Sequence, residues 1–252
     1  MILKRKIYKK LLEWKKECQG KKALLIEGAR RIGKSTICEE FGKSEYKSFL
    51  LIDFAKKDKE VEGYFEKYLN DLDTFFMLLQ THFGTKLTER NSLIIFDEVQ
   101  MFPQARAAIK YLVADGRYDY IETGSLISIR ENVKNIVIPS EERHINMYPL
   151  DFEEFAIALE EDLLVEYIKK CFEKREPLER SMHNQAMLLF HQYMLVGGMP
   201  MPVVTFIESK KDFTEADREK RDILKLYRED IMKIDAKYRS KVLAIYDQIP
   251  GF

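Results

Sequence analysis

The feature that most constrains the fold is an alternation of short apolar runs with longer helix-like segments in the first 150 residues. In chain order, the apolar runs are ALLIEG, SFLLIDF, SLIIFDEV, YDYIETG and HINMYPL. Short, nearly continuous apolar runs are typical of strands that are buried on both faces of a parallel sheet. Helices between such strands are typical of an α/β domain. The pattern therefore predicts a five-stranded parallel α/β domain over residues 23–150.

The pattern changes at Asp151, after which no clear strand remains. The segments with helical periodicity are DFEEFAIALEEDLLVEYIKKCFEK, ERSMHNQAMLLFHQYMLV and DFTEADREKRDILKLYREDIMKI. Turn-rich breaks at REP and GGMPMP separate them. We therefore expect a helical second region over residues 151–252.

Composition narrows the class of protein. The chain has 252 residues, with 42 basic and 42 acidic side chains, and this balance argues against a protein that coats nucleic acid. No run of about 18 apolar residues is present, so we expect no membrane partner and a cytoplasmic location. Cys18, Cys38 and Cys171 lie far apart and form no CxxC pair, which predicts reduced thiols and no zinc site.

Residues 1–22 contain an amphipathic helix with a basic face. Nine lysines and arginines stand here against Glu13 and Glu17. One interpretation is a helix that packs its apolar side on the core and leaves the lysines in solvent; Trp14 favours it, because a lone tryptophan on an apolar side is usually buried. The other is a surface that binds the phosphates of DNA or of a membrane.

A phosphate-binding loop follows the first predicted strand. Residues 28–35 read G-A-R-R-I-G-K-S, which matches the P-loop pattern between a strand and a helix. Glycines let backbone N–H groups face phosphate oxygens, Lys34 reaches the outer phosphates, and the Ser35 hydroxyl ligates magnesium. The predicted nucleotide-binding residues are Gly28, Ala29, Arg30, Arg31, Ile32, Gly33, Lys34, Ser35 and Thr36.

Two further strand ends carry polar side chains. SLIIFDEVQ ends in Asp97, a candidate magnesium ligand, and Glu98, a candidate general base that would polarise the attacking water. ETGS supplies Thr123 and Ser125, whose hydroxyls could orient that water or contact the outermost phosphate. Each stretch alone would also suit a solvated turn or a hydroxyl-capped glycine turn. Beside a phosphate loop, however, both predict catalytic residues at the carboxyl edge of the sheet.

The stretches IEGARRIGKST, LIIFDEVQ, ETGSLI, YPLDFEEF and YMLVGGMPMPV together resemble the prokaryotic AAA-type ATPases that carry a C-terminal domain of unknown function. The resemblance implies a P-loop NTPase fold with sheet order 5-1-4-3-2 and flanking helices, followed by a small helical or winged-helix-like region. It also implies ATP as the nucleotide, Mg²⁺ as the metal, and that the chain looks truncated within the connector to the C-terminal domain.

The resemblance also singles out Arg143, although Glu142 replaces the glycine that usually precedes this arginine. Arg143 could act on the outer phosphate as an arginine finger or sensor, or it could pair with Glu141 or Glu153.

The function expected from these features is a magnesium-dependent ATPase that couples hydrolysis to a conformational change. The alternatives are a nucleotide-dependent switch with negligible hydrolysis and a DNA-associated ATPase. A homo-oligomer and a protein partner at the helical region are further expectations.

Overall fold

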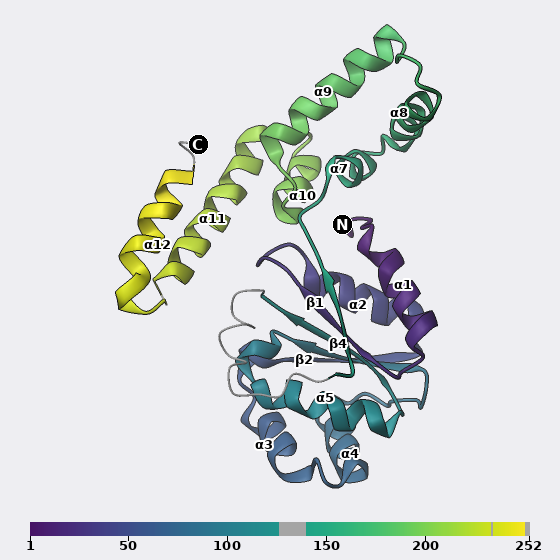
Figure 1. The fold of residues 1–252 in the computed structure, drawn as a ribbon, viewed down its shortest axis with the longest axis vertical. Coiled ribbons are helices and arrows are strands. Elements are labelled where there is room, and N and C mark those ends of the chain that lie inside the picture. Colours follow the sequence, from purple (N-terminus) through teal and green to yellow (C-terminus); the bar gives the residue numbers. More distant parts are fainter. Residues whose placement is uncertain (126–139, 233, 250–252) are drawn as a thin grey trace. The chain divides into compact units, whose positions relative to one another are not determined.

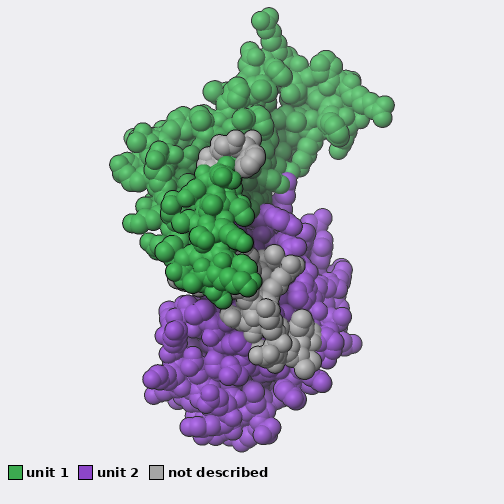
Figure 2. Space-filling model, turned by 60° about the vertical axis from the view of Figure 1, so that its left-hand side comes forward, with its two compact units in different colours: residues 1–3, 149–252 green, residues 4–148 purple. Residues whose placement is uncertain are grey.

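A computed structural model describes residues 1–125, 140–232 and 234–249. The chain divides into two compact units (Figures 1 and 2). The sheet unit comprises residues 4–148, and the helical unit comprises residues 1–3 and 149–252. The chain therefore crosses between the units twice, after Leu3 and after Tyr148.

The sheet unit is built on five parallel strands in the order β2-β3-β4-β1-β5. This confirms the predicted order 5-1-4-3-2, counted from the other edge. The strands are β1 (Ala23–Glu27), β2 (Ser48–Asp53), β3 (Ser92–Asp97), β4 (Asp119–Gly124) and β5 (Glu142–Asn146).

Helices cover both faces of this sheet. In Figure 1, α1 and α2 lie on one face, and α3, α4 and α5 lie on the other. Their bounds are α1 (Ile7–Cys18), α2 (Lys34–Glu45), α3 (Lys59–Tyr68), α4 (Leu72–Phe83) and α5 (Pro103–Asp115).

Two predicted elements differ from the observed ones. The last strand spans Glu142–Asn146 instead of 144–150, because it begins with a buried glutamate that an apolar pattern does not reveal. The helical periodicity of EVEGYFEKYLNDLDTFFMLLQTHF, residues 60–83, predicts a single helix, whereas the structure has two, α3 and α4. Asp71 separates them, since its side chain accepts a hydrogen bond from the backbone N–H of Thr74 and caps α4.

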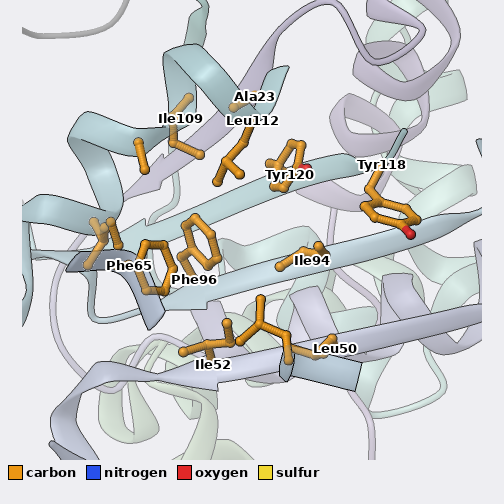
Figure 3. Packing of buried hydrophobic residues seen from close by; sticks show 14 of the residues in the cluster. Ala23, Leu50, Ile52, Phe65, Ile94, Phe96, Ile109, Leu112, Tyr118 and Tyr120 are labelled. Atoms are coloured by element: carbon orange, nitrogen blue, oxygen red, sulfur yellow. The ribbon is translucent and has the colours of Figure 1, made fainter. Parts of the chain in front are cut away.

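The main hydrophobic core lies between the sheet and the helices α3, α4 and α5. Figure 3 shows Phe65 and Phe96 among the aliphatic side chains of the neighbouring strands and of α5. Their rings meet edge to face, with centroids 5.6 Å apart. Phe54 contacts both rings, and Phe102 contacts Phe65 and stacks on Phe54. Aromatic pairs of this kind add to the stability that burial alone provides.

Helix α1 packs on the other face through a stripe at helical spacing, formed by Ile7, Leu11, Trp14 and Cys18. Trp14 is 1% exposed, its ring lies 6.4 Å from that of Phe41 on α2, and its indole N–H donates to the carbonyl of Lys22. The apolar side of the basic helix is therefore part of the sheet unit's core.

A buried polar cluster lies between α5 and the sheet. The guanidinium of Arg106 donates to both carboxylate oxygens of Glu142, at 3.1 and 2.9 Å. Nε2 of His144 lies 3.2 Å from a carboxylate oxygen of Glu142, and its Nδ1 lies 3.5 Å from a carboxylate oxygen of Glu27. Neither oxygen of the neighbouring Glu122 has a hydrogen-bond partner among the described residues. Burial, and then the charge of Glu142, raises the pKa of Glu122 well above its ordinary value, which keeps this carboxyl neutral.

The helical unit contains helices and no strand in the part of it that the structure describes. These helices are α7 (Phe152–Ala158), α8 (Asp162–Lys174), α9 (Arg180–Val196), α10 (Pro200–Glu208), α11 (Phe213–Ile231) and α12 (Ala236–Gln248). The first of the expected helical segments is divided at Leu159–Glu161, where Glu160 has a φ of 64°. No helix within the described ranges is long and apolar enough to cross a membrane.

We predict that Trp14→Ala lowers the free energy of unfolding of the sheet unit by about 3–5 kcal/mol, because it leaves a large cavity between α1 and α2. Urea unfolding followed by circular dichroism measures this change. Leu12→Ala on the exposed side of the same helix is the control, with an expected change within about 0.5 kcal/mol. Equal effects of the two variants would contradict the docking of α1.

The buried cluster predicts a pH dependence of stability. Because the folded pKa of Glu122 lies above its ordinary 4.5, the native state keeps a proton that the unfolded chain releases. The stability that this retained proton provides is fully present below pH 4.5, and it is lost as the pH rises through the folded pKa of Glu122. Glu122→Gln stays neutral at every pH and should raise the free energy of unfolding at pH 8, relative to wild type, by on the order of 1–2 kcal/mol.

Urea unfolding of wild type and Glu122→Gln at pH 5.5 and pH 8 measures the difference. The exposed Glu89→Gln serves as the control and should follow the wild-type pH profile. Identical pH profiles for wild type and Glu122→Gln would mean that Glu122 does not hold a proton in the native state.

Candidate functional site

The strand register places the predicted site residues at one edge of the sheet. Asp97 ends β3 and pairs with Asp53 at the end of β2. Thr123 on β4 pairs with Ile26 on β1, and the phosphate loop begins directly after Glu27. Since all strands run in the same direction, the loop, Asp97 and Thr123 meet at the carboxyl edge.

The phosphate loop has the backbone shape that its sequence predicts. Gly33 has a φ of 90° and is the N-cap of α2, which starts at Lys34. Arg31 also has a positive φ, 67°, which is uncommon for a residue other than glycine. A Cβ on Gly28 would lie 2.4 Å from the carbonyl oxygen of Met147, so only glycine fits here. The N-terminus of α2 thus opens beside the loop, where free N–H groups can bind an anion.

Lys34 is buried at the start of α2, with 5% of its surface exposed. Its ammonium donates to the carbonyl oxygens of Gly28 at 3.1 Å and Ala29 at 2.9 Å, and so closes the loop on itself. Burial lowers the pKa of Lys34, whereas the negative charges of Glu98 and Asp97 act in the opposite direction. A buried cation whose hydrogen bonds go to backbone carbonyls is well placed to gain from a phosphate counter-charge.

Ser35 and Thr123 both donate to the same carboxylate oxygen. The Ser35 hydroxyl donates to Oδ1 of Asp97 at 2.8 Å, and the Thr123 hydroxyl donates to the same oxygen. Asp97 is 7% exposed and Thr123 is fully buried, so this contact is shielded from solvent. Three residues from three separate elements therefore meet at one carboxylate.

Glu98 follows Asp97 in a left-handed conformation, with a φ of 52°. Backbone of this kind in residues other than glycine is frequent at functional sites. Its N–H donates to the Thr123 hydroxyl at 3.3 Å, and its carboxylate accepts a hydrogen bond from the side-chain amide of Gln100. The sharp turn after β3 thus holds Glu98 beside Asp97 and Thr123.

The remaining predicted loop residues differ in their exposure. Ile32 is fully buried, and Arg30 is partly buried. Ala29, Arg31 and Thr36 are exposed. Ser125 follows the end of β4 and is partly buried. The structure thus brings Lys34, Ser35, Asp97, Glu98 and Thr123 together, with the exposed residues at the surface of the loop.

Arg143 lies away from this edge. On β5 it pairs with Leu24, whereas Asn146 pairs with Glu27, the residue before the loop. Arg143 therefore lies three residues before the position opposite Glu27, which is about 10 Å along the strand. The structure therefore does not bring Arg143 to the phosphate loop of its own chain.

The partner of Arg143 is Glu17 on α1, at 2.7 Å, instead of Glu141 or Glu153. The hydrogen bond to Glu17 raises the pKa of Arg143. Both side chains are about half exposed, so this ion pair contributes about 0–1 kcal/mol to stability.

Two residues at the site had no role assigned from the sequence. Gln100 binds the Glu98 carboxylate, and Arg5 donates to the carbonyl oxygen of Ile32 in the phosphate loop, at 3.0 Å. Gln100 could have been noticed because it stands two residues after Glu98. Arg5 could not, since 27 residues separate it from Ile32 and only the docking of the N-terminal segment brings them together.

The basic residues of the N-terminal segment divide into two groups. Arg5 and Lys15 are used within the sheet unit, where Lys15 donates to the carbonyl of Glu45 and lies over the ring of Tyr46. The exposed lysines are Lys4, Lys6, Lys9, Lys10, Lys16, Lys21 and Lys22.

Comparisons with known proteins fit this geometry. Residues 20–156, more than half of the chain, match the family described as AAA domain. A comparison with curated protein sequences finds no match.

Two solved structures are similar at low sequence identity. The Orc1 protein of Aeropyrum pernix, solved in complex with DNA, is 10% identical with a TM-score of 0.38; the match covers 78% of this chain and 68% of that one. PCH-2 of C. elegans is 11% identical with a TM-score of 0.41, over 86% of this chain and 65% of that one. We conclude from the phosphate loop, the acidic strand end and the family match that this chain belongs to the AAA domain family of nucleotide-binding, ATPase-type proteins.

Proposed function

We propose that this protein is a magnesium-dependent ATPase that couples ATP hydrolysis to a conformational change. The observation that carries the proposal is the 2.8 Å hydrogen bond from the Ser35 hydroxyl to Asp97. A hydroxyl from the phosphate loop and a carboxylate from the neighbouring strand end are oxygen ligands of the kind that Mg²⁺ prefers. Their contact supports a shared metal site directly beside Lys34.

The residues at the loop fit a bound nucleotide and its metal. Ser35 and Asp97 would hold the ion, and Lys34 would exchange its bonds to the carbonyls of Gly28 and Ala29 for bonds to phosphate oxygens. A bound magnesium ion neutralises charge that develops on the phosphate oxygens during transfer. The N-terminus of α2 would stabilise the same negative charge.

Glu98 is the proposed general base. It is adjacent to Asp97 in sequence, and its carboxylate can accept a proton from a water that attacks the outermost phosphate. The side-chain amide of Gln100 donates to this carboxylate, and Glu98 would have to exchange that hydrogen bond for one to the water. Thr123 links the backbone of Glu98 to Asp97 and thereby keeps the base beside the metal ligand. Ser125 would contact the outermost phosphate or the water.

The choice of ATP over GTP follows from the AAA family and from the lack of a guanine-binding N/T-K-x-D stretch in the sequence. The conformational change would be transmitted to the helical unit or to a protein that binds it. On helix α9, more than half of the surface of Leu188, Met194 and Leu195 is exposed to solvent. Exposed apolar side chains of this kind are suited to binding a protein partner.

We predict that Glu98→Gln lowers the turnover number for ATP by at least about 100-fold, because removing a general base costs about that factor or more. ATP affinity should change by less than about twofold, since an isosteric amide keeps the loop intact. Phosphate release and equilibrium binding measure the two quantities, and the exposed Glu66→Gln on α3 is the control. Undiminished turnover in Glu98→Gln would remove Glu98 from this role.

A second variant tests the phosphate contact. Lys34→Ala should weaken ATP binding about 10- to 100-fold, because it removes hydrogen bonds from a buried charge. Lys43→Ala, an exposed position on the same helix, should bind as wild type does. Titration with ATP and magnesium, followed by isothermal calorimetry, compares them. Equal affinities would mean that the nucleotide does not bind at this loop.

A nucleotide-dependent switch with negligible hydrolysis is the second candidate. Two contacts favour a switch. Gln100 donates to the Glu98 carboxylate, and Arg143 on β5 pairs with Glu17, away from the carboxyl edge of the sheet. If Arg143 is the arginine that acts on the outer phosphate, a chain in which it pairs with Glu17 would hydrolyse ATP slowly until another copy supplied the arginine.

Turnover per chain at increasing protein concentration distinguishes the two candidates. If a homo-oligomer completes the site, the rate per chain should rise steeply and then saturate, and Arg143→Ala should abolish the rise. A flat rate close to that of the Glu98→Gln variant would instead identify a switch.

A further inference from the structure

Arg5 occupies an unusual position in the chain. It is the second residue of the sheet unit, directly after the first crossing from the helical unit. One terminal nitrogen of its guanidinium donates to the carbonyl of Ile32 in the phosphate loop, at 3.0 Å. The other donates to the carbonyl of Tyr148, at 2.6 Å. Tyr148 is the last residue before the second crossing.

The two carbonyls that Arg5 binds belong to segments that already contact each other. The N–H of Met147 donates to the carbonyl of Glu27 at 2.8 Å, and so extends the β1–β5 pairing up to the start of the loop. The carbonyl oxygen of Met147 would lie only 2.4 Å from a Cβ on Gly28. The chain that leaves the sheet unit is thus packed on the first glycine of the phosphate loop.

The chemistry of this contact requires arginine. Its planar guanidinium presents several donors at fixed angles, so it can bind two carbonyls on different segments at the same time. Charge-assisted hydrogen bonds of this kind are roughly twice as strong as neutral ones. A lysine ammonium keeps the charge, but it lacks the rigid fork that fixes the two segments relative to each other.

The Ile32 carbonyl lies next in the chain to the residues proposed to bind the nucleotide. Ile32 is fully buried and is followed directly by Gly33, the N-cap of α2, and by Lys34. A phosphate that orders the N–H groups of the loop also fixes the direction of the carbonyls on its outer side, since both belong to the same planar peptide units.

We propose that Arg5 is a positioning residue that couples the phosphate loop to both chain crossings between the units. When nucleotide fixes the loop, the Ile32 carbonyl holds Arg5, and Arg5 holds the carbonyl of Tyr148, the residue after which the chain continues into the helical unit. In the other direction, the docked Arg5 keeps the empty loop close to its binding shape. This inference rests on nucleotide binding at the loop, as proposed above, and names the route by which that binding reaches the helical unit.

Hydrogen exchange on the full chain, with and without the non-hydrolysable ATP analogue AMP-PNP and magnesium, tests the proposal. In wild type, the analogue should slow exchange in peptides that cover residues 28–36 and 145–150. In Arg5→Gln at saturating analogue, the loop peptide should remain protected, whereas protection of residues 145–150 should be lost. The dissociation constant for the analogue should rise about tenfold, as expected for losing a charged hydrogen bond that shapes the loop.

Two further variants make the result specific. Arg5→Lys should give intermediate affinity and partial protection of residues 145–150, because it keeps the charge and loses the fork. Lys9→Gln, an exposed position in the same N-terminal segment, should behave as wild type. Trp14 fluorescence should stay unchanged in all variants, which shows that α1 remains docked.

The possible outcomes separate the two proposals. If wild type binds AMP-PNP, and Arg5→Gln has the same affinity and the same protection at residues 145–150, the role of Arg5 is refuted while the proposed function stands. The role is also refuted if exchange at residues 145–150 is faster in Arg5→Gln by the same factor with and without analogue, since that is a purely structural effect. If wild type fails to bind the analogue, the proposed function is refuted, and this inference with it.

Discussion

The parallel register of the central sheet is the constraint on which the rest of the structure depends. It brings the carboxyl ends of β1, β3 and β4 to one edge, so that Ser35, Asp97 and Thr123 share a single carboxylate contact. A shift by one residue in any of these strands would turn the site residue toward the opposite face. The packing of aromatic side chains such as Phe65 and Phe96 against the strands keeps this register fixed.

The two faces of the sheet make different contributions. On one face, the aromatic core under α3, α4 and α5 supplies most of the apolar burial in the sheet unit. The same side buries the polar cluster of Arg106, Glu142 and Glu122. Through His144 this cluster reaches Glu27, the last residue before the phosphate loop. On the other face, α1 places Arg5 against the outer side of that loop. The loop is therefore supported from both faces.

The site combines a preorganised part with a part that depends on its surroundings. Ser35, Asp97 and Thr123 are held by mutual hydrogen bonds, and Lys34 is held by the carbonyls of Gly28 and Ala29, as expected for a site built on rigid elements. Glu98 is engaged by Gln100, and Arg143 is engaged by Glu17, so both would have to change partners to act on a phosphate. This difference gives a physical basis for regulating hydrolysis separately from binding.

The sequence by itself determined the α/β class and the phosphate loop, because strand burial and loop conformation are encoded locally in apolar runs and glycine positions. The strand order followed from family resemblance. Tertiary structure alone decided where Arg143 points, that β5 begins with a buried Glu142, and that Arg5 binds Ile32 and Tyr148. These contacts join residues far apart in the chain through single polar groups, and neither periodicity nor spacing records such pairings; they form only once the packed helices and strands have fixed the distances.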